Sequence, residues 1–378
     1  MTIIDRYLLR QFIKTFVVCY LSLTGLYIVF DAFTNLESFL RAAEEGGGLF
    51  GLMAEFYGYK AVLFFDRTAG LLALVSAMFT VSWIQRHNEM TALMSAGVSR
   101  VRIAVPIIVA ALAISLMGAA SRELVIPNYR NEMARTPHDL LGKQGQSLDA
   151  RYDNQTDILM RGDSTYAKDK RIDKPNFLLP RSLRRHGKQI IGEQAVYLPP
   201  EGDRPGGYLF KQVSEPTGID ERASLRLGDK PVVITPRDAP DWLEPDQCFV
   251  VSEVTFDQLT GGRAFREFSS TAQLIRGLAN PSLDFGADVR VAIHTRLVNP
   301  LLDVTLLMLG LPLVVTGRSR NVFVAIATCS GVVTLFMLVV IGSQHLGTML
   351  VISPALGAWL PLIIFAPAAV GLACGMWE

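Results

Sequence analysis

The stretch IAVPIIVAALAISLMGAA occupies residues 103–120 and contains no charged side chain. A helix needs about 20 mostly apolar residues to cross a bilayer, so this stretch predicts a transmembrane helix. Five further apolar runs lie on either side of it, at residues 12–33, 61–84, 297–316, 322–342 and 354–377. A long polar stretch follows the third run. The sequence therefore predicts an α-helical membrane protein with six transmembrane helices in two groups of three.

The polar stretch between the two groups, residues 121–291, has the composition of a β-rich domain. Short segments rich in Val, Ile, Tyr and Phe alternate there with clusters of Pro, Gly and Asp. The segments are residues 157–160, 189–197, 207–213, 231–235 and 248–256. This spacing predicts an inserted all-β sandwich or barrel-like module. Residues 269–278 read as a short capped helix that leads back to the membrane.

The overall composition argues against several other classes of protein. The 378 residues carry a net charge of +1, so no excess of one sign indicates nucleic-acid binding. Of the four cysteines only Cys248 lies in the polar stretch, so we expect no disulfide there, no metal site and no cofactor. The chain contains no Gly-x-x-x-x-Gly-Lys-Ser/Thr phosphate loop. We therefore expect neither catalytic residues nor ATP hydrolysis by this chain.

Basic residues in the short loops predict the orientation in the membrane. They precede the first run, separate the second from the third, and separate the fourth from the fifth: Arg6, Arg10, Lys14, Arg86, Arg100, Arg102, Arg318 and Arg320. These positions share one side if the helices alternate. One opposite loop is acidic, with Glu37, Glu44 and Glu45, and the other, between residues 341 and 354, has no charged residue. We expect both termini in the cytoplasm, the helices in a bacterial inner membrane, and residues 121–291 outside the cytoplasm.

The loop between the second and third runs reads QRHNEMTALMSAGVSR, residues 85–100. Asn88 suits an N-cap, Glu89 lies in the first turn, and Gly97 is a natural stop. The side chains predicted to share one face are Met90, Leu93, Met94 and Gly97. Residues 88–97 therefore predict an amphipathic helix under the membrane. Two interpretations stay open: the helix packs on lipid head groups, or it docks into a groove on a soluble partner.

Charged residues inside the predicted helices are the other informative group. Asp66 and Arg67 lie inside the outer end of the second helix, and Arg296, Asn299 and Asp303 share one face of the fourth. Buried charges in a bilayer usually face a cavity or a partner. We take Asp66, Arg67, Arg296 and Asp303 as candidate cavity residues, with Arg67 pairing with Asp303 or with an anionic head group. The alternative is that Asp66 and Arg67 neutralise each other or reach the interface.

Several segments, in order along the chain, resemble the LptF/LptG (YjgP/YjgQ) family of lipopolysaccharide-export permeases. They are DRYLLR at residues 5–10, EMTALMSAGVS at residues 89–99, RELVIP at residues 122–127, HTRLVNP at residues 294–300, and LGLPL at residues 309–313. The resemblance rests on the ordered combination of these segments. The three-plus-three arrangement with an outer β-domain is also similar to that family.

The resemblance implies a permease subunit of an ABC exporter that extracts lipopolysaccharide or a related amphipathic lipid and passes it to a periplasmic bridge. The implied partners are a cytoplasmic ATPase dimer, a second homologous permease in a heterodimer, and periplasmic β-jelly-roll proteins. The implied domains are residues 1–120, a jelly-roll-like domain at 121–291, and residues 292–378. In this family the loop helix sits in the ATPase groove, which would place Glu89 against a basic residue and Leu93 in an apolar pocket.

The chain also departs from the family near the outer end of the first helix. Members commonly carry basic residues there, whereas this chain has Asp31 and Glu37, with only Arg41 following. The substrate therefore differs from ordinary lipopolysaccharide, or the second permease supplies the charge. Two other functions remain open from the sequence: an ion-driven secondary transporter, and a membrane scaffold or sensor that displays the β-domain.

Overall fold

The computed structural model describes residues 3–46, 48–137, 139–140, 145–167, 169–202, 204–260, 262–283, 286–315 and 322–374. The chain divides into two compact units. The first contains Met1–Glu37, Phe50–Tyr129 and Gly286–Glu378, and the second contains Ser38–Leu49 and Arg130–Phe285.

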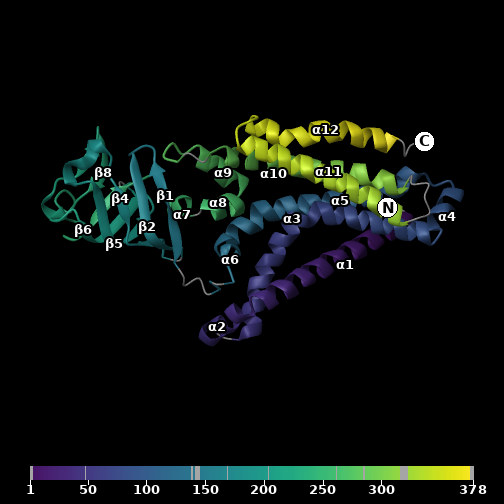
Figure 1. Cartoon of the computed structure of the whole chain (residues 1–378), viewed down its shortest axis with the longest axis horizontal. Helices are drawn as coiled ribbons and strands as arrows, with labels where there is room; N and C mark the ends of the chain where they lie inside the picture. Colours follow the sequence, from purple (N-terminus) through teal and green to yellow (C-terminus); the bar gives the residue numbers. More distant parts are fainter. Residues whose placement is uncertain are drawn as a thin grey trace. The chain divides into compact units, whose positions relative to one another are not determined.

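The first unit is built from long apolar helices (Figure 1). In the described residues six helices are long and apolar enough to cross a membrane, which agrees with the six predicted. They are α1 (Ile3–Thr34), α3 (Leu49–Arg86), α5 (Arg100–Ala120), α10 (Gly286–Val315), α11 (Val322–Thr348) and α12 (Pro354–Cys374). Most begin before the predicted apolar run because the helical backbone continues into the polar interface. The predicted loop residues Arg318 and Arg320, and Trp377 at the end of the sixth run, lie outside the described residues.

Aromatic side chains hold α1 against α3. Phe16 and Tyr20 both meet Phe65 edge-on, with ring centroids 6.4 and 5.8 Å apart. The Tyr20 hydroxyl donates to the backbone carbonyl of Ala61 at 2.9 Å. Most of α1 nevertheless remains uncovered within this chain, because only 11% of its most apolar 18-residue window is buried, compared with 56% for α10. α10 is therefore the central helix of this unit.

Small residues bring α11 and α12 into close contact. A Cβ added to Gly357 would lie 2.8 Å from the Ser343 carbonyl oxygen and 3.0 Å from the Cα of Gly347. Real Cβ atoms do not approach other atoms this closely, so these two helices pack through glycine. The packing of α12 therefore depends on its glycine as well as on its apolar side chains.

The second unit contains an antiparallel sheet, which confirms the predicted all-β insertion. Its nine described strands are β1 (Gln146–Asp153), β2 (Ile158–Tyr166), β3 (Arg171–Asp173), β4 (Asn176–Leu178), β5 (Gln189–Leu198), β6 (Gly207–Glu215), β7 (Leu225–Leu227), β8 (Lys230–Ile234) and β9 (Cys248–Val251). The strand order is β1-β2-β3-β5-β6-β9-β8-β7, and β4 pairs with β2 and β5. β5 alternates buried and accessible residues, as expected for a strand with one face on a core.

Short helices complete the second unit: α6 (Arg130–Ala134), α7 (Phe256–Thr260), α8 (Gly262–Phe268) and α9 (Thr271–Leu278). α9 confirms the predicted capped helix, because Ser270 and Gln273 form a reciprocal capping box. The prediction of one strand over residues 248–256 was wrong at its end, since β9 stops at Val251 and α7 begins at Phe256. α2 (Leu36–Gly46) is a helix where the sequence suggested only a loop.

Candidate functional sites

An ion pair joins α3 to the end of α5 inside the membrane unit. The Arg122 guanidinium donates to both carboxylate oxygens of Asp66, with Nε–Oδ1 at 2.9 Å and Nη2–Oδ2 at 2.9 Å. The Asp66 side chain is 9% exposed and that of Arg122 is 20% exposed. This two-pronged geometry is the strongest arrangement that an arginine makes with a carboxylate.

Side chains from α10 extend this ion pair into a network. When the Asn299 amide is oriented to satisfy both of its groups, its oxygen accepts from Arg122 Nη1 at 3.0 Å and its nitrogen donates to the Thr295 carbonyl at 3.1 Å. Arg296 lies within electrostatic range of Arg122, Glu123 and Asp66. The network therefore links α3, α5 and α10 through groups that would be unfavourable in lipid if they were unpaired.

A second contact on α10 lies next to this network. Asp303 accepts a hydrogen bond from the Ser115 hydroxyl of α5 at 2.5 Å. Gly70 of α3 makes room for this carboxylate, because a Cβ at Gly70 would lie 2.0 Å from Asp303 Oδ1. The adjoining cavity measures about 10 Å³ and is lined by residues of α3, α5 and α10. A cavity of this size holds about one water molecule and is far too small for a lipid.

The structure thus brings together three of the four predicted cavity residues, Asp66, Arg296 and Asp303. Arg67, by contrast, is exposed and lies within electrostatic range of Tyr27 and Lys60. Adjacent positions on a helix point about 100° apart, so Asp66 and Arg67 face different neighbours. Asp303 accepts its hydrogen bond from Ser115, and not from Arg67 as the first interpretation of the sequence predicted. Asp66 pairs with Arg122, and not with Arg67 as the alternative interpretation predicted.

The sequence interpretation did not single out Arg122 as the partner of Asp66. Arg122 lies in a π-helical turn, Ser121–Val125, which continues directly from α5. Single π-turns inside helices are rare and are frequent at functional sites. The only sequence signal was the resemblance of residues 122–127 to the family, because no characteristic amino-acid composition predicts a π-turn.

The loop between α3 and α5 forms the predicted short helix, α4 (Glu89–Ser95). Its end is a Schellman motif: the Val98 N–H donates to the Leu93 carbonyl and the Gly97 N–H to the Met94 carbonyl, both at 3.0 Å. Gly97 has a φ of +82°, which confirms it as the stop. Asn88 is at the N-cap position, but its φ is +58° and its side chain makes no capping hydrogen bond.

The residues predicted to form one apolar face of α4 are divided between two environments. Met90 is 7% exposed and belongs to the core of the membrane unit, and Leu93 is partly buried against that core. Met94 is 41% exposed. The Glu89 carboxylate accepts a hydrogen bond from the Tyr7 hydroxyl of α1 at 2.8 Å. α4 is therefore anchored to its own chain through Met90, Leu93 and Glu89, while Met94 faces outward.

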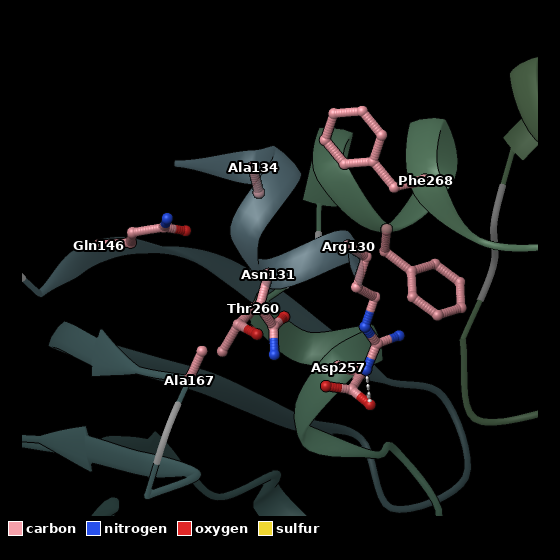
Figure 2. Close-up of a pocket in the computed structure, with 9 residues that line it drawn as sticks. Arg130, Asn131, Ala134, Gln146, Ala167, Asp257, Thr260 and Phe268 are labelled. Carbon is pink, nitrogen blue, oxygen red and sulfur yellow. Dashed lines mark ion pairs between the residues drawn. The ribbon is translucent and has the colours of Figure 1, made fainter. Parts of the chain in front are cut away.

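The second unit has a small hollow beside α6, α7 and α8 (Figure 2). The Arg130 and Asp257 side chains point toward each other there and form an ion pair. The rim also includes Thr260 and two phenylalanine rings, Phe265 and Phe268. The volume is about 80 Å³, which corresponds to a few water molecules. We therefore assign the ion pair a structural role in joining α6 to α7.

Comparison with protein families gives a match that covers most of the chain. The family described as lipopolysaccharide export system permease LptF/LptG matches residues 6–177 and 215–373. The matched segments contain nearly all of α1, the whole of α2 to α5, the network around Asp66, and nearly all of α10 to α12. The comparison with curated proteins returns no match. The family is an inner-membrane transporter subunit of the lipopolysaccharide export system and is not a catalytic enzyme by itself. The chain belongs to the LptF/LptG family of lipopolysaccharide export permeases.

Proposed function

We propose that this chain is one permease subunit of an ABC exporter that extracts lipopolysaccharide, or a related amphipathic lipid, from the inner membrane. A separate cytoplasmic ATPase dimer supplies the energy, and a periplasmic bridge receives the lipid from the β-domain. The observation that carries this proposal is the family match across both groups of membrane helices. Residues 1–120 and 292–378 form the membrane part, both termini are cytoplasmic, and residues 121–291 are periplasmic.

In this proposal α4 transmits motion from the ATPase to the membrane helices. It directly connects α3, which ends at Arg86, with α5, which begins at Arg100. Its contacts through Met90 and Leu93 to the core of the membrane unit, and through Glu89 to Tyr7, couple it to that core and to α1. The contact with the ATPase then involves its outward surface, where Met94 is a large exposed apolar side chain. Asn88 and Gly97 limit the length of the helix.

The lipid cavity requires a second permease in this proposal. In the described residues of one chain, the space beside Asp303 is about 10 Å³, whereas pockets for drug-sized ligands already measure about 300–1,000 Å³. The α1 helix also leaves most of its apolar surface uncovered. A homologous partner would enclose the cavity, and the network of Asp66, Arg122 and Asn299 would keep α3, α5 and α10 together while the cavity changes shape.

Cationic side chains on α3 offset the shortage of basic residues on α1. Asp31 of α1 accepts a hydrogen bond from the Tyr57 hydroxyl at 2.9 Å. Lys60 and Arg67 lie in the same neighbourhood, and the Lys60 ammonium is 5.0 Å from the centre of the Phe56 ring. We propose that α3, and not α1, supplies the positive charge for a phosphorylated lipid in this chain.

The test of the proposed function is purification of the tagged protein from native membranes in a mild detergent, with companions identified by mass spectrometry. We expect a stoichiometric ABC ATPase and a second six-helix permease. Recovery of the protein alone in several detergents, even after crosslinking, would overturn the exporter proposal and favour a scaffold or an ion-driven transporter.

Substitution of Met94 by Asp tests the coupling role directly. Because Met94 is exposed, a charge there should leave folding intact but prevent docking into an apolar groove. The matched control is Leu227→Asp in β7, where an apolar side chain of similar exposure, 43%, lies in the other unit. We expect the ATPase to be lost from Met94→Asp only. Equal retention in both variants would exclude Met94 from the contact.

A further inference from the structure

One pocket lies in the β-domain and shares no residue with the contacts on which the proposed coupling rests. It measures about 660 Å³ and lies beside β7 and β8. Its wall combines two arginines, Arg204 and Arg226, with Asp238, Trp242 and prolines. Small-molecule sites occupy about 300–1,000 Å³. We propose that this pocket binds a phosphorylated saccharide.

The two arginines supply the binding site for the anionic group. Arg204 uses Nη2 for the Pro199 carbonyl and the Glu201 carboxylate, both at 3.2 Å. Its Nε is buried and has no hydrogen-bond partner among the described residues. Arg226 is exposed and forms no ion pair within the part of the chain that the structure describes. Guanidinium groups bind phosphate oxygens through directed N–H donors.

Trp242 supplies a flat apolar surface for a sugar ring. Its side chain is 39% exposed, and the ring is held by an edge-on contact with Phe249 at a centroid distance of 5.2 Å. The electron-rich face of an aromatic ring attracts the partly positive C–H groups of a pyranose. A free phosphate ion would make no use of this surface.

Asp238 distinguishes a saccharide from a simple anion. The backbone N–H of Ser224 donates to Asp238 Oδ2 at 2.7 Å. The hydrogen bonds from Ser224 hold the pKa of Asp238 below its usual range, so this carboxylate is charged at neutral pH. A carboxylate repels a bare anion but accepts hydrogen bonds from sugar hydroxyls. The pocket is therefore suited to a ligand that has both hydroxyl groups and a phosphate.

Part of this pocket lies outside the segments that the family shares. Arg204 and Pro205 fall between residues 177 and 215, where the family match is interrupted. The ligand can be a soluble sugar phosphate or the head group of a lipid, and the second source rests on the proposed function. Failure of this site would leave the association with an ATPase untouched, so the two proposals fail independently.

The test is calorimetric titration of the full-length protein in detergent with glucose 1-phosphate, glucose, inorganic phosphate and an acidic peptide. We expect saturable binding of glucose 1-phosphate that is tighter than binding of the other three probes. Arg226→Gln removes one charged contact and should weaken binding about tenfold, and Trp242→Ala should weaken it similarly. The matched control is Arg161→Gln, an exposed arginine on β2 that does not line the pocket.

A photoreactive benzophenone side chain at Ala239, which lines the pocket, distinguishes the two sources in living cells. A crosslinked glycolipid would assign the site to a lipid head group. Calorimetric binding without a lipid crosslink would assign it to a soluble sugar phosphate. Three results would overturn the proposal: no saturable binding, equal binding of inorganic phosphate, or tighter binding of the acidic peptide.

Discussion

Substitution of Gly70 by Ala should separate α3 from α10 at the Asp303 carboxylate. The added Cβ would lie 2.0 Å from Asp303 Oδ1 and 2.3 Å from its Cγ. Real Cβ atoms do not approach other atoms within 3.0 Å. The Asp303 side chain must therefore move until its atoms lie at least 3.0 Å from the new Cβ. The hydrogen bond from the Ser115 hydroxyl, now 2.5 Å long, would be lost.

The expected loss of stability follows from three terms. Forcing extra volume into a packed site costs about 1–3 kcal/mol. A hydrogen bond to a charged group contributes about 1.5–3 kcal/mol. Alanine offsets roughly 1 kcal/mol of this through its better helix propensity. The net destabilisation is about 1.5–5 kcal/mol, which should lower the unfolding temperature by several degrees.

Thermal unfolding of the detergent-solubilised protein, followed by size-exclusion chromatography, measures this shift. The matched control is Gly58→Ala in the same helix, where the added Cβ meets no atom within 4 Å. We expect that control to unfold at the wild-type temperature or slightly above it. In an Asp303→Ala background Gly70→Ala should cost little, because the clashing carboxylate is gone. An undiminished loss in that background, or no loss in Gly70→Ala alone, would refute the packing argument.

Three further predictions test other parts of the chain. Arg122→Lys keeps the charge but not the two-pronged contact with Asp66, so the unfolding temperature should decrease. In the double variant, Asp66→Asn should decrease the unfolding temperature little further. Gly97→Ala places a side chain at a φ of +82°, which costs about 1–2 kcal/mol, and should speed hydrogen exchange over residues 89–98; unchanged exchange would contradict the role of Gly97 as the stop. Burial raises the pKa of the Cys248 thiol, so iodoacetamide should modify it at pH 8 only after unfolding, whereas the exposed Cys374 should react in both states. For the same reason the free energy of unfolding should fall as the pH rises above the usual thiol pKa, because the Cys248 thiol ionises readily only in the unfolded state. Rapid alkylation of Cys248 in the folded protein would contradict this prediction.

Local patterns in the sequence were sufficient for much of the fold. The apolar runs predicted the membrane helices because only a helix satisfies its own backbone in lipid. The capped helix predicted at residues 269–278 and the Gly97 stop depend on residues within one turn, and both were confirmed. The ends of elements were less accurate: residues 248–256 share a β-rich composition, yet a helix begins at Phe256.

The order of the strands and the partners of the charged residues were decided only by tertiary packing. The sequence determined that Asp66 and Asp303 need partners, because an isolated charge in a bilayer is unfavourable. It did not determine that Asp66 would meet Arg122, 56 positions away, or that Asp303 would meet Ser115, 188 positions away. Helical periodicity defines which residues share a face of one helix, but not which neighbouring helix that face meets. That choice depends on close contacts such as Gly70 against Asp303, which exist only once the helices are packed.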